Sequence, residues 1–268
     1  MTTAGESLLG NARIPYRVGG FAAYCIGLYV QYETLSRARG ESNERQLAYI
    51  RRFGRKILSL WNIQILKRGP YVEHGDQVPK QGPNGKGRIF VSNHRSMFDI
   101  AVHIELCQGR HLSRGDLSKW PVIGLVARRA GVLFVERESK ASGARAVREM
   151  VEQVEKGEAV IIYPEGTTFE GDEVRPFRRG AFTAATESGA EIVPIGVAYD
   201  GTDASFGDES FVQHMTRLSR APGMRCAAVV GEPIPSEGVP LQELSDRVRA
   251  AVQDLVHQAR RVLNENPA

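Results

Sequence analysis

Short apolar runs alternate along most of the chain with longer segments of helical periodicity. The runs are bounded by polar residues, glycine or proline, as strands covered on both faces should be, and they lie at 88–92, 131–135, 159–163, 192–197 and 226–230. Predicted helices lie between or after them, at 97–107, 119–129, 141–156, 179–188 and 241–263. This alternation predicts an α/β fold with a mainly parallel or mixed sheet covered by helices on both faces.

The first quarter of the chain has a different pattern, because residues 18–32 carry no charge. As a helix these residues would extend about 22 Å, which is short of a hydrocarbon core of roughly 30 Å. We therefore expect a helix that does not span a membrane. Tyr24, Tyr29 and Tyr32 suit an interface, where the ring is half buried and the hydroxyl stays wet.

Residues 46–66 form a second helical pattern, in which apolar residues recur at spacings of three and four. Arg51, Arg52, Arg55 and Lys56 fall between them. Two interpretations fit equally: a basic amphipathic helix at a membrane surface, or a core-packing helix with a basic outer face. For Pro194, which interrupts an apolar run, we expect a sheet edge or a bulge.

Composition is that of an ordinary globular protein, with 268 residues of which 42% are hydrophobic and 25% charged. The net charge of +4 is unevenly distributed. Residues 1–68 hold 11 Lys and Arg against 4 Asp and Glu, whereas residues 69–268 hold 24 against 27. We therefore divide the chain into a basic helical segment at 1–68 and a slightly acidic domain at 69–268. The basic segment indicates an anionic partner, either nucleic acid or a phospholipid membrane, or it is a solvated basic surface. Three widely spaced cysteines exclude a disulfide scaffold and favour a reducing compartment.

The candidate chemistry starts at the end of the run 88–92, where the sequence continues Asn-His-Arg-Ser-Met-Phe-Asp. Ser96 can cap the next helix and Asp99 can lie in its first turn. If the chain folds back over that turn, Asp99 reaches the His94 imidazole, and a carboxylate on one ring nitrogen makes the other a better base. A helix cap beside a strand-end histidine also explains these residues.

Four motifs in order resemble those of the glycerolipid acyltransferases, the lysophosphatidic acid acyltransferases and their relatives. They are His94 to Asp99, Gly131 to Arg137 (GVLFVER), Tyr163 to Phe169 (YPEGTTF) and Ile192 to Tyr199 (IVPIGVAY). Residues 114–124 resemble the basic, leucine, proline and glycine pattern that lies between the first two. The resemblance covers roughly residues 50–235.

This resemblance implies that His94 is a general base, which deprotonates an acceptor hydroxyl, and that Asp99 orients it. The hydroxyl would attack an acyl thioester, of coenzyme A or acyl-carrier protein, without a covalent acyl-enzyme. The first candidate acceptor is 1-acylglycerol-3-phosphate. The implied binding residues are Asn93, Arg114, Gly131, Phe134, Arg137, Glu165, Gly166 and Thr167.

One position departs from the family pattern. A basic residue commonly follows the PEGT motif, but here Thr168 stands there. Either Arg175, Arg178 or Arg179 supplies the missing phosphate contact, or the acceptor is a lyso-lipid without that phosphate, such as a lyso-aminolipid.

Other function classes receive less support. The basic residues are interleaved with an apolar face and no nucleic-acid-binding motif appears, so we expect an anionic membrane surface as partner and no nucleic acid. No GxSxG elbow or histidine pair at metal-ligand spacing is present, so we expect no metal and no bound cofactor. A lipid-binding module that has lost catalysis is the other alternative. The expected location is peripheral or monotopic, on the cytoplasmic face of a membrane.

Overall fold

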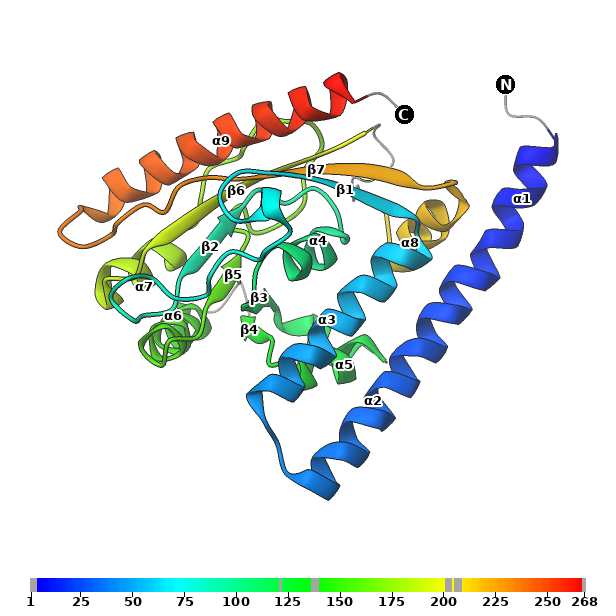
Figure 1. Cartoon of the computed structure of the whole chain (residues 1–268), viewed down its shortest axis with the longest axis horizontal. Helices are drawn as coiled ribbons and strands as arrows, with labels where there is room; N and C mark the ends of the chain where they lie inside the picture. The colour runs from blue at the N-terminus through cyan, green and yellow to red at the C-terminus, as the bar shows by residue number, and fades with distance from the viewer. Residues whose placement is uncertain (1–3, 121, 136–139, 201–203, 205–208, 267–268) are drawn as a thin grey trace.

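A single mixed sheet organises the computed structural model, which describes residues 4–120, 122–135, 140–200, 204 and 209–266. Within these residues seven strands follow the order β1-β7-β6-β2-β5-β3-β4 (Figure 1). The pair β6 and β7 is antiparallel and the other pairs are parallel. The strands are β1 (Ile63–Arg68), β2 (Ile89–Ser92), β3 (Arg110–Arg114), β4 (Leu133–Val135), β5 (Val160–Ile162), β6 (Ile192–Tyr199) and β7 (Met224–Val230).

Helices cover both faces of this sheet, which confirms the predicted fold class. One face packs against α2, α3, α4 and α8, and the other against α6, α7 and α9. A π-helical turn, Pro15–Gly19, joins the first two helices. The described α-helices are α1 (Ala4–Ile14), α2 (Gly20–Arg39), α3 (Asn43–Leu60), α4 (Asp99–Leu106), α5 (Ile123–Arg129), α6 (Lys140–Glu155), α7 (Gly180–Ser188), α8 (Phe211–Arg220) and α9 (Leu241–Glu265).

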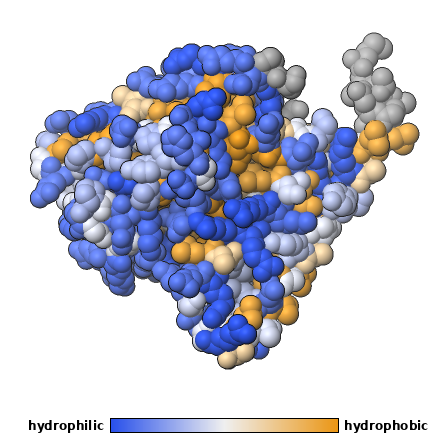
Figure 2. Space-filling view, in the orientation of Figure 1, coloured by the Kyte–Doolittle hydropathy of each residue, from blue (hydrophilic) through white to orange (hydrophobic). Residues whose placement is uncertain are grey.

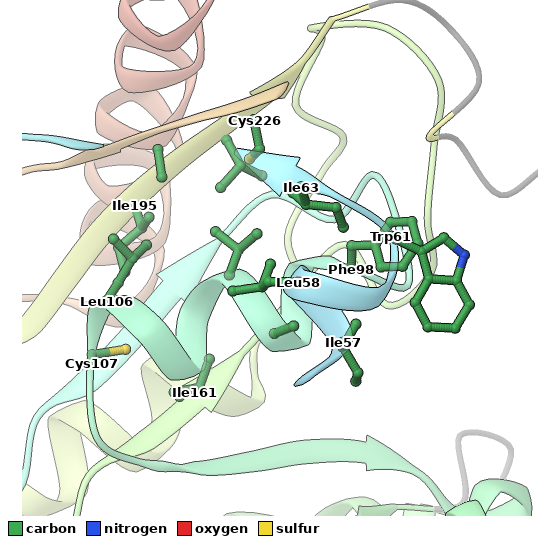
Figure 3. Close-up of a cluster of buried hydrophobic side chains, with 14 of the residues drawn as sticks. Ile57, Leu58, Trp61, Ile63, Phe98, Leu106, Cys107, Ile161, Ile195 and Cys226 are labelled. Atoms are coloured by element: carbon green, nitrogen blue, oxygen red, sulfur yellow. The ribbon is translucent and has the colours of Figure 1, made fainter. Parts of the chain in front are cut away.

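The larger core cluster lies between the sheet and the helices α3 and α4, and Figure 3 shows its centre. Trp61 and Phe98 are fully buried there, with ring centroids 5.6 Å apart. Phe98 directly precedes the first residue of α4, which is Asp99. Packing of this ring therefore fixes where α4 begins, and with it the position of the candidate catalytic carboxylate.

Two strands and two helices differ from the sequence prediction. The helix predicted at 46–66 ends at Leu60, because Asn62 adopts a positive φ of 52° and the chain then enters β1. Strand β3 has the sequence RHLSR, in which the apolar signal is too weak to predict a strand. The sequence prediction also lacks the helix α8, whereas each of the five predicted strands overlaps one that the structure shows.

Pro194 lies inside β6, an interior strand, so the expected sheet edge is wrong. The expected bulge is present: Ile195 pairs with Val230 but Ile192 pairs with Ile234, so the segment after β7 carries one extra residue beside Pro194. Its carbonyl accepts a hydrogen bond from Gly231, the residue just after β7. In an antiparallel pair the nitrogen of a residue points to the same side as its carbonyl. The side of Pro194 that lacks an N–H therefore faces the end of β7. The paired residues of β6 and β7 begin at Ile195 and Val230, so proline removes no hydrogen bond between them.

The N-terminal helices are packed onto the body. Arg17 is buried and donates to the carbonyl oxygens of Leu60 and, around the end of α8, of Ser219 and Ala221. The apolar side of α3 is buried against α4, which agrees with the core-packing interpretation of that helix. No described helix combines the length with the apolar character that crossing a bilayer requires.

Candidate active site

The motif residues gather at one edge of the sheet. The strands β6, β2, β5, β3 and β4 share a direction, so their carboxyl ends meet at that edge, where open α/β sheets bind their ligands. His94 follows β2, Glu165 follows β5, Arg114 ends β3 and Phe134 lies within β4. Arg137, one of the implied binding residues, lies outside the described residues.

His94 and Asp99 form the predicted pair. The Nδ1 atom of His94 lies 2.7 Å from Oδ2 of Asp99. The side chain of Asp99 is fully buried, while that of His94 is 19% exposed. An ionised carboxylate only accepts hydrogen bonds, so Nδ1 carries the proton and Nε2 of the neutral ring has its lone pair free to act as a base.

Four donors converge on the Asp99 carboxylate. Oδ2 accepts from His94 and from the main-chain N–H groups of Arg95 and Ser96, and Oδ1 accepts from the hydroxyl of Tyr199 at 2.7 Å. Burial alone would raise the pKa of Asp99, but the hydrogen bonds to His94, Ser96 and Tyr199 outweigh burial and lower the pKa. Asp99 therefore stays ionised although no water reaches it.

The turn between β2 and α4 differs in one detail from the prediction. Ser96 does not cap α4: its hydroxyl accepts from the N–H of Phe98, which lies before the helix. Instead, the carboxylate of Asp99 reaches back to the N–H groups of residues 95 and 96. The predicted fold-back is thus confirmed, with Asp99 as its acceptor.

Tyr163 lies against the imidazole of His94, and two buried histidines, His103 and His111, lie around Tyr163. The ring of Tyr163 stacks on His94, with centroids 4.2 Å apart and planes 14° from parallel. Burial lowers the pKa of His103, and it lowers the pKa of His111 to about 3 with help from the neighbouring histidines. Both are therefore neutral at physiological pH, and neither competes with His94 for a proton.

A buried ion pair joins the first and third motifs. Arg95 donates to both carboxylate oxygens of Glu165, and Glu165 also accepts from the main-chain N–H of His94 at 2.6 Å. The side chain of Arg95 is 5% exposed and that of Glu165 is fully buried. Glu165 was predicted to bind substrate, but this geometry occupies its oxygens within the protein and uses them to hold the His94 main chain.

Asn93 has a similar internal role in the structure. Its fully buried amide donates to the carbonyl of Val197 and accepts from the N–H of the same residue. These two bonds tie the end of β2 to β6, so they fix the point from which His94 projects.

The exposed rim of the site contains the residues that can meet a ligand. Thr167 is exposed, and Gly166 adopts a positive φ of 82°. A Cβ atom at Gly166 would lie 2.5 Å from Nε of Arg178, so only glycine lets that guanidinium lie against the turn. Arg178 is itself exposed. Gly131 also has a positive φ, at 68°, and a Cβ there would collide with Arg110.

An apolar cavity opens beside the pair. It lies on the face of the sheet that α3, α4 and α5 cover, and its wall includes Ile100 and Ile104 of α4. His111 also lines it, and the ring of His111 lies 6.3 Å from that of Tyr163, which stacks on His94. Two aromatic rings, those of His111 and Tyr163, therefore lie between this part of the cavity wall and the reactive imidazole.

Several of these residues escaped the sequence prediction. Arg95 stands inside the first motif and Tyr163 begins the third, so their positions were a usable signal. Tyr199 is 100 positions from Asp99, and no local pattern links the two. Among the described residues, no three His, Cys, Asp or Glu side chains gather as metal ligands would.

The Arg95–Glu165 pair generates a stability prediction. We expect Glu165→Gln to lower the free energy of unfolding by about 3 kcal/mol, because it leaves the buried Arg95 charge without its counterion. Equilibrium urea unfolding measures this loss. The control is Glu149→Gln, which removes a partly exposed ion pair with Arg145 and should cost less than about 1 kcal/mol. Equal losses in the two variants would contradict the inferred burial of charge.

Comparison with known proteins finds one matching family and several relatives of similar sequence. Residues 71–198 match the family described as Acyltransferase. A lyso-ornithine lipid O-acyltransferase of Pseudomonas aeruginosa is 34% identical over 206 residues, which cover 74% of this chain and 77% of that protein. The chloroplastic 1-acyl-sn-glycerol-3-phosphate acyltransferase BAT2 of Brassica napus is 31% identical, over 62% of this chain and 48% of that protein.

A solved structure extends the likeness to the fold. The crystal structure of PlsC from Thermotoga maritima, a 1-acyl-sn-glycerophosphate acyltransferase, superposes with a TM-score of 0.71 at 21% identity. The match covers 94% of this chain and 95% of that one. Together with the family match and the relatives above, these findings show that the chain belongs to the acyltransferase family and is an O-acyltransferase.

Proposed function

We propose that this protein transfers a fatty acyl group from an acyl thioester to the free hydroxyl of a lyso-lipid, with 1-acylglycerol-3-phosphate as acceptor. The observation that carries the proposal is the pair of His94 and buried Asp99, together with an apolar cavity whose wall includes Ile100, the residue after Asp99. Acyl transfer to a lipid needs both features at one place.

The proposed reaction proceeds in one addition and one elimination. Nε2 of His94 takes the proton of the acceptor hydroxyl as the oxygen attacks the thioester carbonyl. The carbon–sulfur bond then breaks, the new ester remains, and the imidazolium returns its proton to the departing thiolate. Asp99, held ionised by its hydrogen bonds, stabilises the imidazolium between the two proton transfers.

The apolar lining of the cavity supports a fatty acyl donor. Its walls are aliphatic and aromatic side chains of α3, α4 and α5, which favour burial of methylene groups at about 0.8 kcal/mol each. We place the donor acyl chain there, with its carbonyl beside His94. Coenzyme A and acyl-carrier protein both fit this proposal, because the cavity selects the chain that they carry.

The placement of Arg178 supports a phosphate-bearing acceptor. Thr168 gives no charged contact, but the guanidinium of Arg178 lies against Gly166 in the same motif and is exposed. A guanidinium offers paired donors that match phosphate oxygens. We therefore assign to Arg178 the contact that the family takes from the residue after the PEGT motif.

A lyso-ornithine lipid is the second candidate acceptor. Thr168 itself favours it, because this acceptor has no glycerol phosphate to neutralise. Among the relatives, those from Pseudomonas aeruginosa and Brucella abortus carry the name lyso-ornithine lipid O-acyltransferase. Both candidates use the same base and the same hydroxyl chemistry.

We also propose that the protein binds the cytoplasmic face of a membrane as a peripheral or monotopic protein. Two sides of α2 are apolar: Cys25 and Leu28 face the body, while Ile26 and Val30 are 52% and 55% exposed. Leu8 of α1 is 72% exposed, and Figure 2 shows apolar side chains along the edge that α1 and α2 form. Exposed arginines accompany this edge and suit lipid phosphates. The free, buried cysteines fit a reducing compartment.

His94→Ala tests the reaction. We expect the variant to remain folded and to lose acyl transfer by at least about 100-fold, since a positioned general base contributes roughly that much or more. The measurement is mass-spectrometric product formation from acyl-CoA or acyl-carrier protein, with lysophosphatidic acid and lyso-ornithine lipid as alternative acceptors. Near-normal turnover by His94→Ala would refute the mechanism, and a strong preference for lyso-ornithine lipid would replace the proposed acceptor.

Arg178→Gln tests acceptor recognition. We expect the KM for lysophosphatidic acid to rise about tenfold with little change in kcat, because a charged hydrogen bond to the bound phosphate is lost. The KM for lyso-ornithine lipid should stay the same. Arg247→Gln, on the exposed side of α9, is the matched loss of one surface arginine. If both variants behave alike towards lysophosphatidic acid, Arg178 does not contact its phosphate.

The double variant Ile26→Ser, Val30→Ser tests membrane association. We expect weaker sedimentation with anionic phosphatidylglycerol vesicles, because two exposed apolar side chains no longer enter the interface. Tyr71→Ser is the control, since Tyr71 is 41% exposed on the loop after β1. Unchanged vesicle binding by the double variant would show that the membrane-binding surface lies elsewhere on the protein.

A further inference from the structure

The fourth motif, Ile192 to Tyr199, has no residue assigned to substrate binding or to proton transfer so far. It forms β6, which pairs in parallel with β2 and so ends at the same edge of the sheet as the strand before His94. Its last residue, Tyr199, points its hydroxyl at the catalytic carboxylate, with 2.7 Å between Oη and Oδ1 of Asp99. The motif thus contacts the histidine–aspartate pair through one hydrogen bond.

Tyr199 is a fixed donor in that bond. Burial and the adjacent Asp99 charge raise the pKa of Tyr199 well above its usual value, so the hydroxyl keeps its proton. The main-chain oxygen of Tyr199 accepts from Arg260 of α9 at 2.7 Å, and Arg260 forms an ion pair with Asp172. The residue is therefore held at both ends, by α9 and by Asp99.

We propose that Tyr199 is a positioning residue that sets the orientation of Asp99 and thereby the proton affinity of His94. The inference rests on the acyl transfer proposed above. The hydroxyl draws negative charge toward Oδ1, away from the oxygen that faces the imidazole. Without this bond more charge would lie on Oδ2, so the imidazolium would be stabilised and His94 would be protonated to higher pH.

The buried titratable groups around the pair do not change their charge near neutral pH. Burial lowers the pKa of His103 and of His111, and it raises the pKa of Tyr163 and of Cys226. These four groups are therefore neutral across the physiological range. The charged neighbours, Arg95 and Glu165, are bound to each other. A change in the pH profile after substitution of Tyr199 would thus report on His94 and Asp99.

A purely structural role for Tyr199 predicts a different result. Loss of one buried hydroxyl would then lower stability and the amount of folded enzyme, but the pH profile of the folded fraction would not move. Ser236→Ala supplies the matched control, since Ser236 is also buried and donates a hydrogen bond of 2.8 Å, to Ala185, with no contact to the pair.

The experiment compares the wild-type protein, Tyr199→Phe and Ser236→Ala in full-length form. Histidine-labelled NMR gives the titration midpoint of His94, whose signal is identified by its loss in His94→Gln. Steady-state assays across pH give kcat and the acid limb of kcat/KM. For Tyr199→Phe we expect the midpoint and the acid limb to move up by about half a pH unit and kcat to fall about tenfold. Ser236→Ala should match the wild type in all three quantities.

An unchanged His94 midpoint in folded Tyr199→Phe overturns the inference, whatever happens to stability. If that variant does not fold, the same measurement is made with 3-fluorotyrosine at position 199. This residue has nearly the same volume as tyrosine, and its more acidic hydroxyl is a stronger hydrogen-bond donor. The midpoint should then move down, and a midpoint equal to that of the wild type overturns the inference. The NMR measurement needs no turnover, so absence of acyl transfer would refute the proposed function separately.

Discussion

A carboxylate that no water reaches must receive all its hydrogen bonds from the protein, and Asp99 imposes this requirement on the surrounding fold. Its donors come from three places: the His94 ring, the turn at residues 95 and 96, and Tyr199 of β6. These donors converge only because β6 lies next to β2 and runs parallel to it. The order of strands in the sheet thus supplies the hydrogen bonds that keep Asp99 ionised.

A second set of polar contacts holds the turn that carries His94. Arg95 binds Glu165 and also donates to the main-chain oxygens of residues 171 and 173. Gln253 of α9 then bonds the same loop at Asp172 and Val174. Motifs far apart in sequence are therefore joined by buried hydrogen bonds, and the reactive imidazole rests on a rigid frame while the rim at Thr167 and Arg178 stays exposed.

The apolar surface of the N-terminal segment serves two purposes. The inner sides of α2 and α3 complete the core, where Phe21 packs edge-on against Trp61 at 5.8 Å. The outer side of α2 keeps Ile26 and Val30 exposed, which a helix with one purely core-facing stripe would not do. Because Arg17 fixes this segment to Leu60 and to the end of α8, its exposed side has a defined direction relative to the active site.

The sequence by itself determined the α/β class, the five apolar strands, the motif residues and the fold-back of Asp99 onto His94, because each depends on local periodicity or on residues a few positions apart. It did not determine β1, whose apolar spacing continued that of the preceding helix until Asn62 broke it, nor the polar strand β3, nor the interior place of Pro194. Only the tertiary structure decided that Glu165 pairs with Arg95, that Arg178 lies against Gly166, and that Tyr199 meets Asp99. These contacts join residues 12 to 100 positions apart in sequence, and the folding of the sheet and its loops is what brings them together.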